Sequence, residues 1–191
     1  EPPGRTWVYH TSDTFILTQA MNAYLKSQAG AEADIFNLVR DEVYIPAGLS
    51  AGALTSLRTG NSPTGAPMGG YGLLLTLDDT AKIARLLNND QGRIAGQPVL
   101  EPSLLAAALQ QNSADRGLDT TGSPVYKYNN GFWALPLNNS CRRWVPFMSG
   151  YGGIVVALPP TGPSYYYFSD NGQYNWHSAL VEIDRIIPFC P

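Results

Sequence analysis

Residues 3–17 read PGRTWVYHTSDTFIL and lead the chain from a turn into a helix. A Pro-Gly pair opens the stretch as a turn signal, and the Thr-Ser-Asp triplet that follows Tyr9 and a histidine holds the residue types that cap helices. Apolar residues then recur at roughly helical spacing. The stretch therefore predicts an amphipathic helix over 11–26, with Tyr9 held just before its start.

Tyr9 has two interpretations at this position. A phenol normally loses its proton near pH 10, so Tyr9 acts as a base only if a neighbouring cation lowers its pKa. The other interpretation is an aromatic core residue beside the start of a helix. The local pattern alone favours the core residue, and the order of the later segments raises the weight of the catalytic one.

Helices and strands alternate with turn signals along the rest of the chain. Thr76 and Asp79 resemble a capping box that begins the helix at 77–89. Strands gathered between helices predict an α+β fold in which an antiparallel sheet is covered by the terminal helix. The expected helices are 11–26, 34–43, 77–89, 102–111 and 174–187, and the expected strands are 130–137, 144–158 and 164–170.

The composition excludes several classes of function. The chain has 191 residues, of which 44% are hydrophobic and 14% charged, and its net charge is −3. This charge balance offers no basic patch for nucleic acid. No apolar run approaches the roughly 18 to 20 residues that span a bilayer, so no membrane span is expected. His10 and His177 are the only histidines, and neither has a second ligand at metal spacing, so we expect no metal and no cofactor.

The two cysteines, Cys141 and Cys190, stand far apart in the sequence. A disulfide between them ties the terminal segment to the sheet and implies an oxidising compartment. The alternative is a pair of buried thiols.

Five segments carry short motifs that matter in combination. Each is weak alone, and together they cover nearly the whole chain. They are Tyr9-His10-Thr11, the PAGLS run within 43–50, Gly69-Gly70 followed by the helix at 76–87, NGFW at 130–133, and FMSGYGG at 147–153.

In this order the segments resemble signatures of the serine β-lactamase and penicillin-binding-protein superfamily, particularly its class C β-lactamase and esterase branch. The resemblance departs from the family pattern at Thr11, which replaces the usual Asn of Tyr-x-Asn, and at Ala47, which replaces a Leu. It departs again at Met148, where a Lys or His is common. The lost amide at Thr11 and the lost cation at Met148 favour an ester or amide hydrolase over an efficient β-lactamase.

The resemblance implies a β-lactamase/transpeptidase-like fold, an antiparallel sheet flanked by helices with part of a helical subdomain. It implies a serine hydrolase that acts on an ester, amide or peptide through an acyl-enzyme, in the periplasm or outside the cell. Tyr9 is then the catalytic residue that relays a proton to the leaving group. Thr11, Ser149, Gly150 and Tyr151 then bind substrate, with the Tyr151 backbone N–H as one oxyanion donor.

The family's nucleophile is the serine of Ser-x-x-Lys, and that pattern does not occur in this sequence. The residues three positions before Lys26, Lys82 and Lys127 are an alanine, an aspartate and a proline. The resemblance therefore implies that residues 1–191 are the C-terminal portion of one catalytic domain, with 1–125 mainly helix and loop and 126–191 strands and a terminal helix. The missing N-terminal part then carries Ser-x-x-Lys, and this chain alone is inactive. The alternative is a non-catalytic binding or interaction module that retains the fold.

Overall fold

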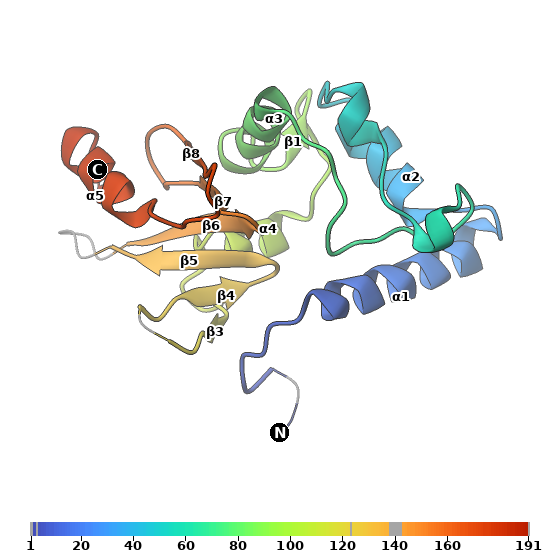
Figure 1. The fold of residues 1–191 in the computed structure, drawn as a ribbon, viewed down its shortest axis with the longest axis horizontal. Helices are drawn as coiled ribbons and strands as arrows, with labels where there is room; N and C mark the ends of the chain where they lie inside the picture. Colours follow the sequence, from blue (N-terminus) through green and yellow to red (C-terminus); the bar gives the residue numbers. More distant parts are fainter. Residues whose placement is uncertain (1, 3, 123, 138–142, 191) are drawn as a thin grey trace. The chain divides into compact units, whose positions relative to one another are not determined.

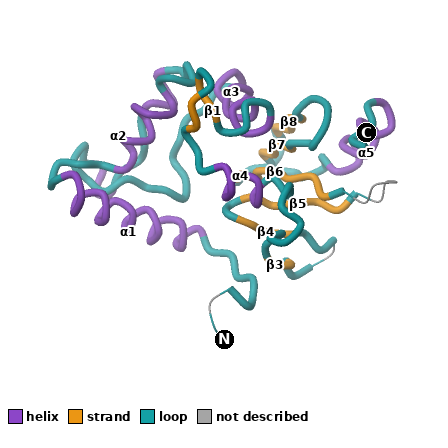
Figure 2. The backbone as a smooth tube through the Cα atoms, turned by 180° about the vertical axis from the view of Figure 1, so that it is seen from behind, coloured by secondary structure: helices purple, strands orange, loops and turns teal. Residues whose placement is uncertain are grey.

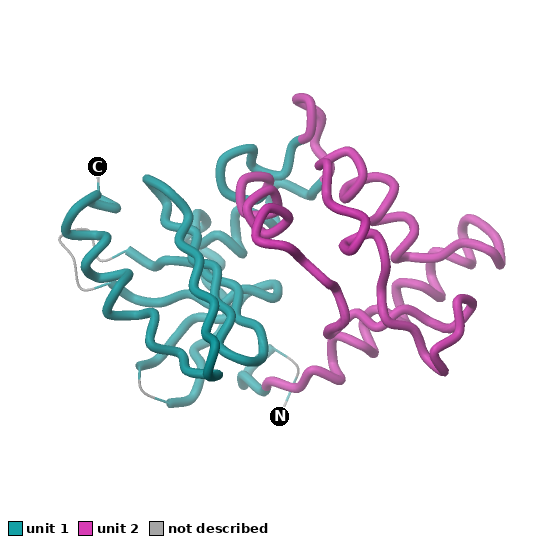
Figure 3. The backbone as a smooth tube through the Cα atoms, turned by 45° about the horizontal axis from the view of Figure 1, so that its top comes forward, with its two compact units in different colours: residues 1–8, 87–93, 100–191 teal, residues 9–86, 94–99 magenta. Residues whose placement is uncertain are grey.

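The computed structural model describes residues 2, 4–122, 124–137 and 143–190. The chain divides into two compact units, shown in Figure 3. Unit 1 comprises Glu1–Val8, Leu87–Arg93 and Leu100–Pro191, and unit 2 comprises Tyr9–Leu86 and Ile94–Val99. Helix α3 (Leu77–Asn88) belongs mostly to unit 2 and ends in unit 1.

Unit 1 is built on a six-stranded antiparallel sheet among its described residues. Successive strands are neighbours throughout, in the order β3-β4-β5-β6-β7-β8, and the labels in Figures 1 and 2 can be followed in this order. The predicted α+β class is confirmed. The strands are β3 (Leu118–Asp119), β4 (Lys127–Asn129), β5 (Phe132–Pro136), β6 (Trp144–Gly150), β7 (Ile154–Ala157) and β8 (Tyr165–Phe168).

Helix α5 (His177–Ile186) packs on this sheet, as the sequence predicts. Side chains alternate between the two faces of a strand, so every second residue of β5, β6 and β7 points toward α5. Leu180 of α5 and Trp176, the residue before it, pack against these strand residues. The ring centroids of Trp176 and Phe147 lie 4.7 Å apart. The full cluster is Leu135, Leu137, Val145, Phe147, Val155, Ala157, Trp176, Leu180 and Phe189.

Helix α4 (Pro102–Ala108) is shorter than the predicted 102–111 and contacts β4. Proline stands at its favoured first position, and the Glu101 side chain accepts a hydrogen bond from the backbone N–H of Ser103.

The predicted strand at 144–158 is in fact a hairpin of β6 and β7. Gly150 pairs with Ile154, and Gly152 and Gly153 between them have φ values of 90° and 82°. That left-handed region favours glycine, so the chain reverses there. A second reversal joins β4 to β5 through Asn130 and Gly131, whose φ values of 48° and 86° are typical of a type I′ hairpin turn.

Unit 2 is helical, as predicted. Helix α1 (Thr11–Ala29) is followed by α2 (Ile35–Val39), which continues directly into a π-helical turn (Arg40–Tyr44). Asp34 is the N-cap of α2, and its side chain accepts a hydrogen bond from the backbone N–H of Asn37 at 3.0 Å. Two 3₁₀ turns (Ala51–Leu54 and Thr59–Asn61) interrupt the long loop before α3, and the short ribbon of β1 (Arg93–Ile94) and β2 (Gln97–Pro98) follows that helix.

Within the described part of the chain, no helix has both the length and the apolar content needed to cross a bilayer.

Candidate functional site

Tyr9 and Thr11 lie at the start of α1, where the sequence places them. Tyr9 is 45% exposed and precedes the helix, and Thr11 is its first residue. The expected cap from the Thr-Ser-Asp triplet is not formed. His10 is the N-cap, no side chain caps the helix, and the backbone N–H of Asp13 donates to the His10 carbonyl at 3.0 Å. Asp13 in the first turn still suits the positive end of the helix dipole.

Gly69 and Gly70 lie directly against α1. A Cβ added to Gly70 would stand 2.8 Å from Cγ2 of Thr11 and 2.9 Å from the Thr11 carbonyl oxygen, and one added to Gly69 would overlap the Thr18 side chain. Real side chains do not approach so closely, so only glycine permits this contact. The tyrosine segment and the Gly-Gly segment, separate in the sequence, therefore meet within unit 2.

A pocket of about 440 Å³ opens beside this contact, entirely within unit 2. Its walls come from α1, from α2 with the π-helical turn, and from the chain at 67–73. No charged side chain is among the described residues that line it. Burial raises the pKa of the Tyr44 hydroxyl above its usual value. The lining residues outside 67–73 are Thr18, Met21, Ile35, Phe36, Val39 and Tyr44.

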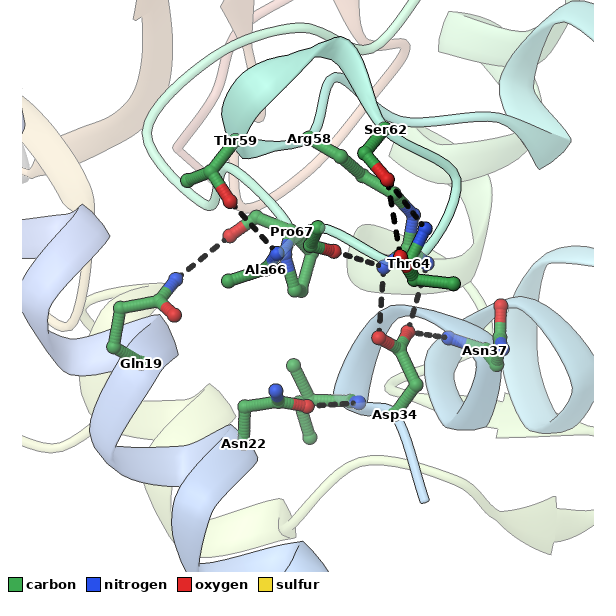
Figure 4. A network of polar contacts seen from close by, with 12 residues as sticks. Gln19, Asn22, Asp34, Asn37, Arg58, Thr59, Ser62, Thr64, Ala66 and Pro67 are labelled. Carbon is green, nitrogen blue, oxygen red and sulfur yellow. Dashed lines mark hydrogen bonds and ion pairs between the residues drawn. The ribbon is translucent and has the colours of Figure 1, made fainter. Parts of the chain in front are cut away.

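A network of polar side chains fixes the loop that forms one wall of this pocket (Figure 4). Arg58 donates two hydrogen bonds to the carboxylate of Asp34, at 2.8 and 2.9 Å, and a third to the Gly65 carbonyl at 2.9 Å. Both charged side chains are only 15% exposed. The Gln19 side chain of α1 donates to the Pro67 carbonyl at 2.9 Å. The loop is thus tied to both α1 and the start of α2.

The Asp34 carboxylate is stabilised in its charged form. The hydrogen bonds from Arg58 are the main cause of a lowered Asp34 pKa, with the capping bond from Asn37 adding to them and burial opposing them. The Asp34–Arg58 pair is therefore neutral as a unit and contributes no net charge to this part of unit 2.

The predicted capping box of α3 is present. Asp79 is fully buried, and its carboxylate accepts hydrogen bonds from the backbone N–H and hydroxyl of Ser50, both at 2.6 Å. It also accepts from the backbone N–H and hydroxyl of Thr76, at 2.9 and 2.7 Å, and the Asp79 N–H donates back to the Thr76 hydroxyl. These bonds, led by the Ser50 hydroxyl, hold the pKa of Asp79 far below its ordinary value. Asp79 thus joins the PAGLS segment to α3.

Ser50 lies in a Gly-x-Ser-x-Gly pattern at 48–52, which marks the nucleophile in one class of serine hydrolases. That pattern needs the serine on a sharp turn between a strand and a helix. Here Ser50 follows helical turns, begins a 3₁₀ turn and donates its hydroxyl to Asp79. The geometry makes Ser50 a structural residue.

Ser149, Gly150 and Tyr151 lie together on the β6–β7 hairpin of unit 1. Ser149 is paired with Val155 and half-buried, whereas the Tyr151 side chain is fully exposed at the turn. The Tyr174 hydroxyl donates to the Gly150 carbonyl at 2.8 Å. Gly153 leaves no room for a Cβ beside Ser169 and the Gln173 carbonyl. The hairpin tip therefore packs against the segment that follows β8.

The predicted site residues divide between the two units. Tyr9 and Thr11 belong to unit 2, and Ser149, Gly150 and Tyr151 belong to unit 1. The aromatic residue before Tyr9, Trp7, belongs to unit 1 and lies 5.5 Å, ring to ring, from Trp133 of β5. This Trp133 is part of the predicted NGFW segment and pairs with Phe147 at the start of FMSGYGG.

Sequence reasoning missed the Asp34–Arg58 pair, the Tyr174 contact and the pocket. Asp34 directly before a helix is an N-cap signal that the sequence does contain. Arg58 and Tyr174 are paired with residues remote in the chain, and no local pattern identifies such partners.

Cys190 is disulfide-bonded. Cys141 falls outside the described residues, so the pairing of these two cysteines stays a prediction.

Among the described residues, no group of three or more His, Cys, Asp or Glu side chains is arranged to hold a metal ion.

No protein-family model matches the sequence, and a search of characterised proteins finds no significant relative.

Proposed function

We propose that this chain is part of a serine hydrolase of the β-lactamase-like superfamily that cleaves an ester or amide through an acyl-enzyme. The observation that carries the proposal is the contact of Gly70 with Thr11. Two segments matched separately to the family pattern meet there through glycines that no other residue can replace. The Asp79 bonds to Ser50 likewise join the PAGLS segment to the helix that follows Gly69-Gly70.

In the proposed mechanism the lysine of a Ser-x-x-Lys outside this sequence holds Tyr9 partly as phenolate, and the serine of that motif attacks the substrate carbonyl. The Tyr9 phenolate accepts the serine's proton and passes it to the leaving group. The backbone N–H of Tyr151 stabilises the oxyanion, and the Ser149 hydroxyl binds the substrate. The Tyr174 hydroxyl donates a hydrogen bond to the Gly150 carbonyl, which shares a peptide group with the Tyr151 N–H. This bond supports the oxyanion role, because a preorganised donor stabilises a transition state better than a mobile one.

The proposal includes a polypeptide segment, carrying Ser-x-x-Lys, that covers apolar surface of unit 2. Helix α1 has only one buried residue, Asn22, and exposes Ile16 by 63%, Leu17 by 58% and Tyr24 by 69%. An apolar surface of this kind on one helix is typical of an interaction site.

Hydrolysis assays with the full gene product test this function. We expect turnover of p-nitrophenyl butyrate and little turnover of nitrocefin. Tyr9→Phe removes the hydroxyl that relays the proton and lowers kcat/KM for the ester by about 10²- to 10⁴-fold. Tyr24→Phe is the matched control, since Tyr24 is exposed on the same segment, and it leaves the rate unchanged. Turnover of nitrocefin alone contradicts the proposed ester or amide specificity.

The second candidate is a binding module without catalysis, which the absence of Ser-x-x-Lys from this sequence favours. It predicts that the full gene product hydrolyses neither substrate and that the gene encodes no Ser-x-x-Lys. Ester turnover that depends on Tyr9 excludes it.

A further inference from the structure

The wall of the unit 2 pocket at 67–73 is fixed by three sets of contacts. Gly69 and Gly70 seat the chain at 67–73 on α1. The Pro67 carbonyl accepts from Gln19, and the Met68 N–H donates to the Leu57 carbonyl at 2.9 Å. The Asp34–Arg58 pair fixes the base of the loop to α2, as Figure 4 shows. Three of the seven residues at 67–73 are glycines, and added Cβ atoms there would strike Thr18, Thr11 and Leu57, so close backbone contacts seat this wall.

The chemistry of the lining selects an uncharged ligand. No charged group is among its described residues, and the nearby Asp34 and Arg58 neutralise each other. Met21 and Met68 line the pocket, two of the chain's three methionines. Methionine is flexible and adapts its shape, which suits a flexible apolar partner. A volume of about 440 Å³ lies near the small end of ligand pockets, which run from about 300 to 1,000 Å³.

We propose that this pocket binds the acyl or alkyl chain of an uncharged ligand, with residues 67–73 as one wall and Met21 as another. The claim that this acyl chain is part of an ester or amide substrate rests on the proposed function. The binding of an apolar chain rests on the pocket alone.

Titration of the full gene product with 1-butanol, 1-hexanol and 1-octanol, followed by calorimetry and ligand-observed NMR, measures this binding without any turnover. Each buried methylene strengthens hydrophobic binding by up to about fourfold, so affinity rises steeply from butanol to octanol. Absence of octanol binding, or equal affinity for the three alcohols, overturns the proposal.

Two variants at Met21 locate the binding. Met21 is 48% exposed, so its substitution leaves the core of unit 2 intact. Met21→Trp fills the pocket and Met21→Glu places a charge at its wall, and each weakens octanol binding by about tenfold or more. Gln28→Trp, exposed on the same helix and outside the lining, is the control and changes affinity by less than about twofold. Circular dichroism verifies that α1 is retained. Octanol binding that survives both Met21 variants overturns the proposal.

Kinetics then separate this inference from the proposed function. If octanol binds at Met21 and no ester is hydrolysed, the proposed function fails and the pocket stands. Suppose instead that esters are hydrolysed, and that the ratio of kcat/KM for p-nitrophenyl octanoate to that for p-nitrophenyl acetate is the same in Met21→Glu as in the native protein. The pocket then does not take the substrate's acyl chain, and the proposed hydrolase stands.

Discussion

Unit 1 and unit 2 are stabilised by different kinds of interaction. In unit 1 a sheet and α5 bury large apolar side chains, among them Phe147, Trp176 and Phe189. In unit 2 the buried apolar side chains, apart from Pro67, are Leu49, Ala53, Ala84 and Leu86. Hydrogen bonds to two carboxylates and close glycine contacts fix its loops instead. The difference shows that unit 1 is specified by burial and unit 2 by a few irreplaceable polar and glycine residues.

The largest expected effect is in the core of unit 1. Phe189→Ala removes a fully buried ring and lowers the free energy of unfolding by about 3–5 kcal/mol. All four tryptophans belong to unit 1, so tryptophan fluorescence during urea denaturation reports on this unit. Ile186→Ala, where the side chain is 78% exposed, is the control and changes stability little. Equal losses for the two variants contradict a unit held by burial.

The next largest expected effect is a different response of the two units to acid. The folded-state pKa values of Asp34 and Asp79 lie below the unfolded value of about 3.9. Their contribution to stability is therefore complete above about pH 4 and is lost as the pH falls through the folded values. Below that pH, hydrogen exchange corrected for its intrinsic pH dependence shows faster opening at Ser50 and Thr76.

Asp79→Asn removes part of this acid sensitivity, because the carboxylate that Ser50 and Thr76 hold is no longer titratable. The tryptophan signal of unit 1 changes less over the same range. Identical acid transitions in both signals contradict the separate stabilisation of unit 2.

A smaller effect distinguishes a buried ion pair from an exposed one. Arg58→Ala leaves the Asp34 carboxylate, which is only 15% exposed, without its partner and costs unit 2 about 1–3 kcal/mol. Arg40→Ala breaks the more exposed pair with Asp41, which water screens, and destabilises unit 2 less. Hydrogen exchange at the Asn37 amide, which Asp34 caps, measures both. Similar exchange in the two variants shows that the Arg58 network does not hold the loop.

The smallest effect concerns the β6–β7 hairpin. Tyr174→Phe removes one hydrogen bond to the Gly150 carbonyl and costs about 0.5–1.5 kcal/mol at most, because the bond is exposed. The tryptophan midpoint changes little. NMR of the Tyr151 amide detects the loosened turn, and an unchanged amide signal excludes a positioning role for Tyr174.

The helices of unit 2 and the class of the fold follow from the sequence because their patterns are local. Apolar spacing predicts that α1 is a helix, but the expected amphipathic pattern is wrong, since most of its apolar residues are exposed and its one buried residue is Asn22. Thr76 with Asp79 identifies the start of α3. The prediction of one strand at 144–158 is wrong for a local reason too. The positive φ values of Gly152 and Gly153 reverse the chain there and make a hairpin. The pocket and the Arg58 network are set by partners remote in the chain, so no pattern along the sequence reveals them.

Covalent labelling tests the proposed hydrolase most directly. The full gene product is incubated with a fluorophosphonate probe, and intact masses are measured under reducing and non-reducing conditions. We predict that one serine outside this sequence, in a Ser-x-x-Lys of the same or a co-purifying polypeptide, gains a single probe adduct, and that Tyr9→Phe slows its formation. The absence of any labelled polypeptide contradicts the hydrolase and leaves the non-catalytic binding module as the function of this fold.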